Sequence, residues 1–335
     1  MSEGRFQHAT KARTADCAVL VTAVFSAATL GCSIFMASLE GSTLFGNNID
    51  DGNPHTFYEI VPATQSGDYG FITLGFNQPQ GGLNEAGLAF DTNAVASAPL
   101  EPQSALRSHP EGPFGIATEM LRKAATVEQA LDIARSYDWG DALTNQWFFA
   151  DASGDAVVIS AGGDGELAFT RKPAGDGYLI STNINRARTR VIRACWRYRT
   201  IDRMLGRLMK QRELSAPVFT DILDAAHQEA VFLRDGVLLN TEYSNIYDLQ
   251  TREITLYYWF QFDEPLVLRL DEELARGPMR VRVASLFPAA LVQRAVQINQ
   301  AHMERLATWR SFPWIPTMIA LALFSAIAAF ALIRR

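Results

Sequence analysis

The sequence predicts an α+β domain. Along the chain, one block of short strands precedes a set of helices and a second block follows it. Strands are indicated where apolar and polar residues alternate, and helices where apolar residues recur every three or four positions. The strands come in runs and do not alternate one by one with helices, which favours a layered α+β domain over a parallel sheet. With 335 residues, 48% of them hydrophobic, the chain is long enough to bury a large core.

The first predicted element is a hairpin over residues 32–50, with Glu40, Gly41 and Ser42 at its turn. Alternation predicts further strands over residues 56–61, 69–76, 87–93, 147–150, 156–160, 166–170, 177–181, 244–248 and 253–260. Helical spacing predicts helices over residues 115–124, 127–136, 199–210 and 216–229. The remaining polar and glycine-rich positions between strands are interpreted as hairpin and structural residues, namely Gly82, Asn84, Glu85 and Gly87.

An apolar segment near the amino end resembles a secretory signal in its layout. Lys11 and Arg13 precede an apolar run over residues 17–31 that ends in small residues. Cleavage after this run would make Cys32 the first residue of the mature chain. Residues 1–31 are therefore expected to be a signal-like propeptide that is removed, with an uncleaved anchor or a buried helix as the open alternatives.

A second apolar segment lies near the carboxyl end. Residues 314–333 include no charged side chain, and a helix of this length spans about 30 Å of hydrocarbon. Trp314 suits a position at the membrane surface, and Arg334 and Arg335 follow, which places the carboxyl end in the cytoplasm. We therefore expect a transmembrane helix over residues 314–333, a stalk over residues 291–313 and an extracytoplasmic domain over residues 32–290. The alternative is a hydrophobic core helix.

Composition excludes several classes of function. The formal net charge of −6 and the pI near 5.5 argue against nucleic acid as a partner. The five histidines stand far apart, without the HxxxH or CxxC spacing that would bring two ligands to one metal. Three cysteines do not make a disulfide framework. We expect no metal and no cofactor.

Cys32 is the candidate nucleophile because processing would place its thiol and a free α-amine on the same residue. A free α-amine has a pKa near 7.7 to 8.0, so it can act as the base for its own thiol at neutral pH. The chain has no GxSxG motif and no cysteine and histidine close together in sequence. A lone cysteine is, as the ordinary alternative, a small buried apolar residue, which is the interpretation given to Cys195.

Four stretches of the sequence resemble, in order, the linear amide C–N hydrolases, the group of penicillin V acylases and bile salt (choloylglycine) hydrolases. They are CSIFMASLEGSTLFGNNID from Cys32, QPQGGLNEAGLAFDTNA from Gln78, YLISTNIN from Tyr178 and TEYSNIYDLQTREITLYYW from Thr241. The resemblance runs over about residues 32–288. It implies a four-layer αββα Ntn-hydrolase fold and hydrolysis of a linear N-acyl amide through a thioester on an amino-terminal cysteine.

The resemblance also implies roles for individual residues. Cys32 matches the nucleophile, and Asp50 matches an aspartate held against it. Asn93 lies at or beside the position whose backbone amide helps to bind the oxyanion, and Asn183 matches the asparagine whose side chain supplies the other donor. Arg197 is a looser match to an arginine near the nucleophile. As alternatives, Asp50, Asn93 and Asn183 could simply serve turns.

One position departs from the pattern. Asn47 stands where many bile salt hydrolases have arginine, and the two side chains are not interchangeable, so bile salts and penicillin V are not implied as substrates. Acyl transfer to a second amine, in place of hydrolysis, is compatible with the same thioester. Two other accounts of the chain stay open: an exported binding protein with Cys32 as its lipid attachment site, and an inactive Ntn-like scaffold.

Overall fold

The computed structural model describes residues 31–51, 55–173, 175–189, 192–229, 231–232 and 238–310. The predicted propeptide, apart from Gly31, and the predicted transmembrane helix over residues 314–333 lie outside this part of the chain. Among the helices that the structure describes, none combines the length and the apolar character needed to cross a bilayer.

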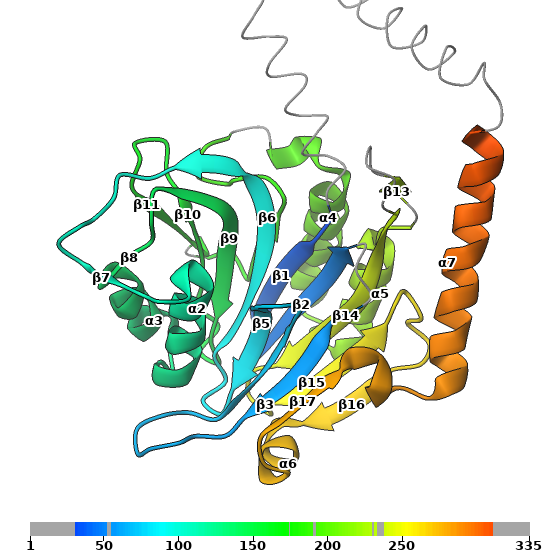
Figure 1. Ribbon diagram of the computed structural model, residues 1–335, viewed down its shortest axis with the longest axis horizontal. Helices are drawn as coiled ribbons and strands as arrows, with labels where there is room; N and C mark the ends of the chain where they lie inside the picture. The colour runs from blue at the N-terminus through cyan, green and yellow to red at the C-terminus, as the bar shows by residue number, and fades with distance from the viewer. Residues whose placement is uncertain are drawn as a thin grey trace, which may run out of the picture.

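Two antiparallel sheets face each other at the centre of the molecule, and helices cover their outer faces (Figure 1). The first sheet has the strand order β12-β1-β2-β14-β15-β16, with β13 beside β14. Its strands are β1 (Ser33–Leu39), β2 (Ser42–Asp51), β12 (Tyr178–Thr182), β13 (Val231–Phe232), β14 (Leu238–Asp248), β15 (Glu253–Tyr258) and β16 (Leu266–Arg269).

The second sheet has the strand order β11-β10-β9-β6-β5-β4-β3-β17. Its strands are β3 (Phe57–Val61), β4 (Phe71–Gly75), β5 (Pro79–Asn84), β6 (Ala89–Pro99), β9 (Ala142–Ala150), β10 (Ala156–Ala161), β11 (Leu167–Arg171) and β17 (Met279–Arg282). A separate parallel pair joins β7 (Arg107–Ser108) to β8 (Tyr137–Asp138).

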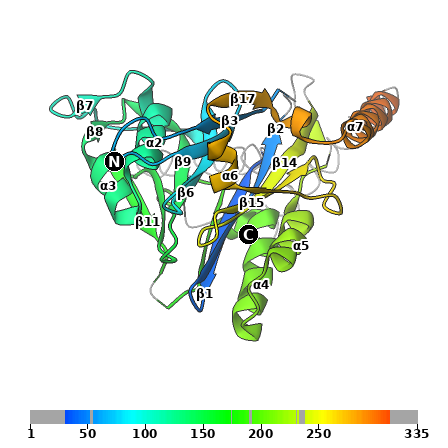
Figure 2. The ribbon, with the colours of Figure 1, turned by 90° about the horizontal axis from the view of Figure 1, so that it is seen from below.

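The helices form two outer layers. Helices α4 (Trp196–Gln211) and α5 (Ala216–Ala226) pack on the first sheet, and α2 (Gly112–Lys123) and α3 (Val127–Arg135) form a core with the second. Seen from below, the two pairs of helices lie on opposite sides of the strands (Figure 2). The order of layers is thus helix, sheet, sheet, helix, as the α+β prediction and the resemblance require.

The remaining elements lie mostly in the last part of the described chain. They are η1 (Ile192–Ala194), α6 (Leu270–Ala275), η2 (Val283–Leu286) and α7 (Ala289–Arg310). Helix α7 lies at the edge of the molecule beside the first sheet, where the side chain of Gln261 donates to the carbonyl of Leu291 at 3.2 Å (Figure 1). The described part of the predicted stalk is therefore helical and packs on the domain.

Alternation along β1 explains how one strand serves two cores. Ile34 and Met36 enter the core between the sheets, whereas Phe35 and Ala37 enter the core under α4 and α5. Successive side chains of a strand point to opposite faces, so a strand buried on both sides needs apolar residues at nearly every position. The sequence SIFMASL meets this requirement.

The predicted hairpin at the start of the domain is confirmed. Glu40 and Gly41 lie at its turn with φ values of 53° and 85°, the left-handed conformations that a tight two-residue turn requires. Strand β5 was not predicted as a strand. Its sequence PQGGLN has low strand propensity, and it is held in the sheet by pairing with β4 on one side and β6 on the other.

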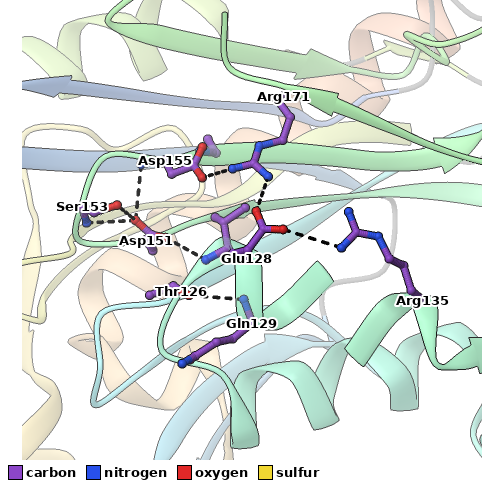
Figure 3. Close-up of polar contacts among 10 residues, drawn as sticks. Thr126, Glu128, Gln129, Arg135, Asp151, Ser153, Asp155 and Arg171 are labelled. Carbon is purple, nitrogen blue, oxygen red and sulfur yellow. Dashed lines mark hydrogen bonds and ion pairs between the residues drawn. The ribbon is translucent and has the colours of Figure 1, made fainter. Parts of the chain in front are cut away.

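Asp151 ties the second sheet to its covering helices. It follows β9, is buried, and accepts a hydrogen bond from the Val127 backbone N–H at the start of α3 at 2.7 Å (Figure 3). Its other oxygen accepts from the backbone and the hydroxyl of Ser153. A carboxylate at a helix amino end satisfies a backbone donor and opposes the helix dipole, so Asp151 has a structural role.

Candidate active site

Cys32 lies at one end of the first sheet, immediately before β1, whose neighbours are β12 and β2. Ser33 pairs with Asn48, so the neighbouring Cys32 lies beside Ile49 of β2. Cys32 packs against the core between the sheets, and its Sγ lies 3.9 Å from the carbonyl oxygen of Asp50. In this structure Cys32 is joined to Gly31, so its α-amine is part of a peptide bond.

Asp50 and Arg197 form a buried ion pair behind Cys32. Asp50 lies near the end of β2 on the face that α4 covers, and Arg197 lies in the first turn of α4. The Arg197 Nη1 donates to Asp50 Oδ2 at 2.9 Å, and the side chains are 1% and 0% exposed. The hydroxyl of Thr241 donates to the other carboxylate oxygen of Asp50. The carboxylate is therefore bound at both oxygens.

Arg197 also binds the third residue of this network. Its Nη2 donates to Asn183 Oδ1 at 3.0 Å, so one guanidinium joins Asp50 and Asn183. The planar guanidinium can make two directed hydrogen bonds at once, which a lysine cannot. Cys32, Asp50, Asn183 and Arg197, distant in the sequence, thus meet at one end of the first sheet.

Asn93 and Asn183 are brought together between the sheets. Asn183, directly after β12, donates from Nδ2 to the carbonyl of Ala94 at 2.9 Å, and Asn93 on β6 accepts from the hydroxyl of Ser181 at 2.6 Å. An amide nitrogen carries two hydrogens, so Asn183 retains one donor beyond the bond to Ala94. All five residues predicted from the sequence are therefore close to this end of the molecule.

Burial controls the electrostatics of the site. It raises the pKa of the Cys32 thiol, and the charge of Asp50 raises it further, while the Arg197 cation opposes both. Burial also raises the pKa of Asp50, against the effects of Arg197 and Thr241. Glu242 has a pKa raised to about 9, first by burial and then by the nearby carboxylates of Asp51 and Asp50. The thiol therefore requires a base to become a nucleophile.

Gly31 packs directly against Asp50. A Cβ added to Gly31 would lie 2.0 Å from the Cβ of Asp50 and 2.8 Å from its carbonyl oxygen. Any side chain at this position would force Asp50 to move. The peptide bond before Cys32 therefore lies at the site and can do so because residue 31 is glycine.

Asn47 binds a carboxyl group that sequence reasoning did not single out. The Asn47 Nδ2 donates to Asp91 Oδ2 across the space between the two sheets, and both residues are buried. Asp91 lies in the quoted stretch GLAFDTNA, two residues before Asn93. The sequence could therefore have drawn attention to Asp91, but it could not indicate that Asn47 is its partner. Thr241 likewise lies in the quoted stretch that begins TEY, and only the fold shows that it binds Asp50.

Comparisons with known proteins agree with this architecture. Residues 38–258 match the family model described as acyl-coenzyme A:6-aminopenicillanic acid acyl-transferase. No curated protein matches the chain.

Two solved structures show the same fold. A mutant of conjugated bile acid hydrolase from Clostridium perfringens has a TM-score of 0.59 at 12% identity, over 75% of this chain and 96% of the other. Penicillin V acylase from Agrobacterium tumefaciens has a TM-score of 0.51 at 15% identity, over 68% of this chain and 83% of the other.

The resemblance to Ntn-hydrolase linear amide C–N hydrolases, predicted from the sequence, is thereby confirmed. The matching model covers well over half of the 335 residues. The chain belongs to the acyl-coenzyme A:6-aminopenicillanic acid acyl-transferase family.

Proposed function

We propose that the protein hydrolyses a linear N-acyl amide through Cys32, after removal of the residues before it. The observation that carries the proposal is the position of Cys32 against Asp50, with Asp50 and Asn183 held by the same buried guanidinium of Arg197. An amidase needs a nucleophile, a base and donors for the oxyanion, and this arrangement offers a residue for each.

The free α-amine of a terminal Cys32 would be the base. Because burial raises the pKa of the thiol, the thiol stays protonated until a neighbouring group takes its proton. An α-amine with a pKa near 8 can do so at neutral pH. Asp50, fixed by Arg197 and Thr241, would orient this amine through a charge-assisted hydrogen bond.

The reaction proceeds through two acyl transfers. The Cys32 sulfur attacks the amide carbon, and the oxyanion is held by the Asn183 side chain and a backbone N–H near Asn93. The amine leaves with the proton that the thiol gave up, and a thioester remains on Cys32. Water, deprotonated by the α-amine, then hydrolyses the thioester and releases the acid. No cofactor takes part in these steps.

Acyl transfer is the second candidate, and the family favours it. The matching family is described as an acyl-transferase, and a thioester can react with an amine as well as with water. Supplying a second amine during turnover separates the two: hydrolysis alone gives only the free acid, whereas transfer gives a new amide whose yield rises with the amine concentration.

The two ends of the chain add a proposed location. Removal of residues 1–31 and insertion of residues 314–333 into a membrane would leave the catalytic domain attached to the outer side of that membrane. Protease digestion of intact cells, followed by detection of the domain, tests this: degradation only after the cells are opened would contradict it.

The test of the proposed function combines mass spectrometry with an amide screen. Intact mass and amino-terminal sequencing of the full-length expressed protein should show Cys32 as the first residue, and the Cys32→Ala variant should be inactive. Cys195→Ala is the matched control, because Cys195 is a second free cysteine and its side chain is buried in the core under α4. A diacylglyceryl group on Cys32 would support the lipid-anchored alternative. An intact chain that starts at Met1 and turns over amides would contradict the proposed base.

A further inference from the structure

A polar cluster lies between the two sheets, beside the nucleophile. Ile34, Asn47 and Asn245 lie side by side on β1, β2 and β14, and Tyr243 and Tyr247 flank Asn245 on the same face of β14. Ile34 follows Cys32 by two residues on the same face of β1, which is about 6.6 Å along the strand, so this row is one step further into the sheet than Cys32. Most of the surrounding core is apolar, which makes a group of polar side chains here unusual.

Asp91 faces this row from the second sheet. It is 1% exposed, and its two oxygens accept from Asn47 Nδ2 and from the Thr92 backbone N–H. Opposite it on β5, a Cβ at Gly81 would lie 2.3 Å from Asp91 Oδ2. The glycine therefore leaves room for the carboxyl group, and no side chain at position 81 separates it from the other sheet.

Asp91 has no cationic partner in the part of the chain that the structure describes. Burial raises its pKa well above the ordinary range, and only Thr92 and Asn47 oppose this. Arg197 is the cation whose charge reaches the Cys32 thiol, but it binds Asp50, on the opposite face of the first sheet. Among the described residues, the wall beside the thiol thus offers a carboxyl group and no cation.

Several polar atoms around Asp91 are buried without a hydrogen-bond partner among the described residues. They are Asn47 Oδ1, Asn93 Nδ2, Tyr243 OH, Asn245 Nδ2 and Tyr247 OH. Buried polar atoms in proteins are nearly always paired, so a group of unpaired ones beside a nucleophile indicates a place where a polar group of a ligand or ordered water binds. Ionised Asp91 would raise the pKa of Cys32, Tyr243 and Tyr247, so these groups lie near it.

We propose that Asp91, held by Asn47, and Tyr243 form a charge filter next to the scissile amide, which accepts an uncharged or cationic group and rejects a carboxylate or sulfonate. This inference rests on the proposed amidase function and adds a substrate class to it. An anion buried beside a carboxyl group and without a cation would be strongly disfavoured. A hydroxyl or an ammonium group would instead find acceptors in Asp91 and Tyr243.

Three substrates with one acyl chain and amines of similar size test the filter. They are N-decanoylethanolamine, which is neutral, N-decanoyl-1,2-diaminoethane, which is cationic, and N-decanoylglycine, which is anionic. The protein is expressed from the full-length sequence and used after maturation. Its kcat/KM for the neutral and cationic amides should exceed that for the glycine amide by at least about ten-fold. Two variants, Asp91→Asn and Asn47→Arg, should reduce this ratio by about ten-fold or more.

Asp151→Asn is the matched control, because Asp151 is also a buried carboxyl group, yet it lies at the start of α3 and binds only backbone and Ser153 (Figure 3). It should change the melting temperature and leave the ratio unchanged. Circular dichroism and thermal unfolding of all variants establish that they fold.

The outcomes separate this inference from the function on which it rests. Equal use of all three amides by the wild type, or a ratio unchanged in both Asp91→Asn and Asn47→Arg, overturns the charge filter and leaves the amidase standing. The cluster would then bind only structural water. If the wild type turns over none of the three amides, and the inactive Cys32→Ala variant binds none of them, the amidase function fails and the filter with it.

Discussion

Arg197 and Asp50 are 147 positions apart in the chain, yet they form an ion pair of 2.9 Å that is almost fully shielded from solvent. The pair joins the first turn of α4 to the end of β2, directly behind Cys32. Removing one member of a buried pair leaves the other as an uncompensated charge, which is more costly than losing the attraction alone.

The first prediction is that Arg197→Met destabilises the protein by about 3 to 5 kcal/mol and abolishes amide turnover. Stability falls because Asp50 stays buried, and activity falls because Asp50 and Asn183 lose their shared partner. Thermal and denaturant unfolding measure the first effect. Arg193→Met is the control: Arg193 is exposed, its ion pair with Asp202 lies at the surface, and its loss should cost less than about 1 kcal/mol. Equal losses in both variants would contradict the special role of the buried pair.

The second prediction concerns the oxyanion. Asn183→Ala should lower kcat by about 100- to 1,000-fold with a much smaller change in KM, because the lost hydrogen bond forms chiefly in the transition state. Asn185→Ala is the control two positions away, since its side chain donates to the carbonyl of Ala161 and does not reach Arg197. Steady-state kinetics on one amide measure both. A change in KM alone would assign Asn183 to substrate binding.

The third prediction concerns the proposed cut before Cys32. A secretory peptidase accepts alanine before the cleavage site, whereas in this fold a Cβ at Gly31 collides with Asp50. We expect the cut to take place within this site, so Gly31→Ala should accumulate as the uncut chain. Gly163→Ala, where a Cβ meets nothing within 4 Å, should mature normally. Intact-mass measurement shows whether each variant has been cut before residue 32. Normal maturation of Gly31→Ala would mean that a separate peptidase makes the cut.

The fourth prediction concerns pH. Glu242 has a pKa of about 9 in the fold, first because it is buried and then because Asp51 and Asp50 lie near, against about 4.3 in an unfolded chain. Between these values the folded state holds one more proton, so this group lowers stability as pH rises, by up to about 1.4 kcal/mol per pH unit.

Glu242→Gln removes this contribution. The melting temperature of the variant should therefore fall less than that of the wild type between pH 5 and pH 9. Glu253→Gln is a control at a partly exposed position on β15 and should follow the wild type. Parallel curves for Glu242→Gln and the wild type would show that Glu242 is ionised in the fold throughout this range.

Strand and helix positions could be predicted where the pattern is local. The alternation over β1 and β2 and the glycine at their turn are enough for a hairpin, and the apolar spacing of α2 to α5 is enough for the helices. Strand β5 was missed because PQGGLN resembles a turn, and its strand conformation comes from its two neighbours. Helix α4 begins at Trp196, earlier than predicted, which brings Arg197 into the first turn.

The sequence by itself determined where Cys32 stands, that a hairpin carries Asp50 beside it, and which family the chain resembles, because these depend on neighbouring residues and on the order of motifs. Only the tertiary structure decided that Arg197 binds Asp50 and Asn183, and that Asn47 meets Asp91 between the sheets. These contacts join residues that are far apart in the chain. Packing of a helix on a sheet, or of one sheet on another, selects such partners, and no local pattern records which side chains will meet.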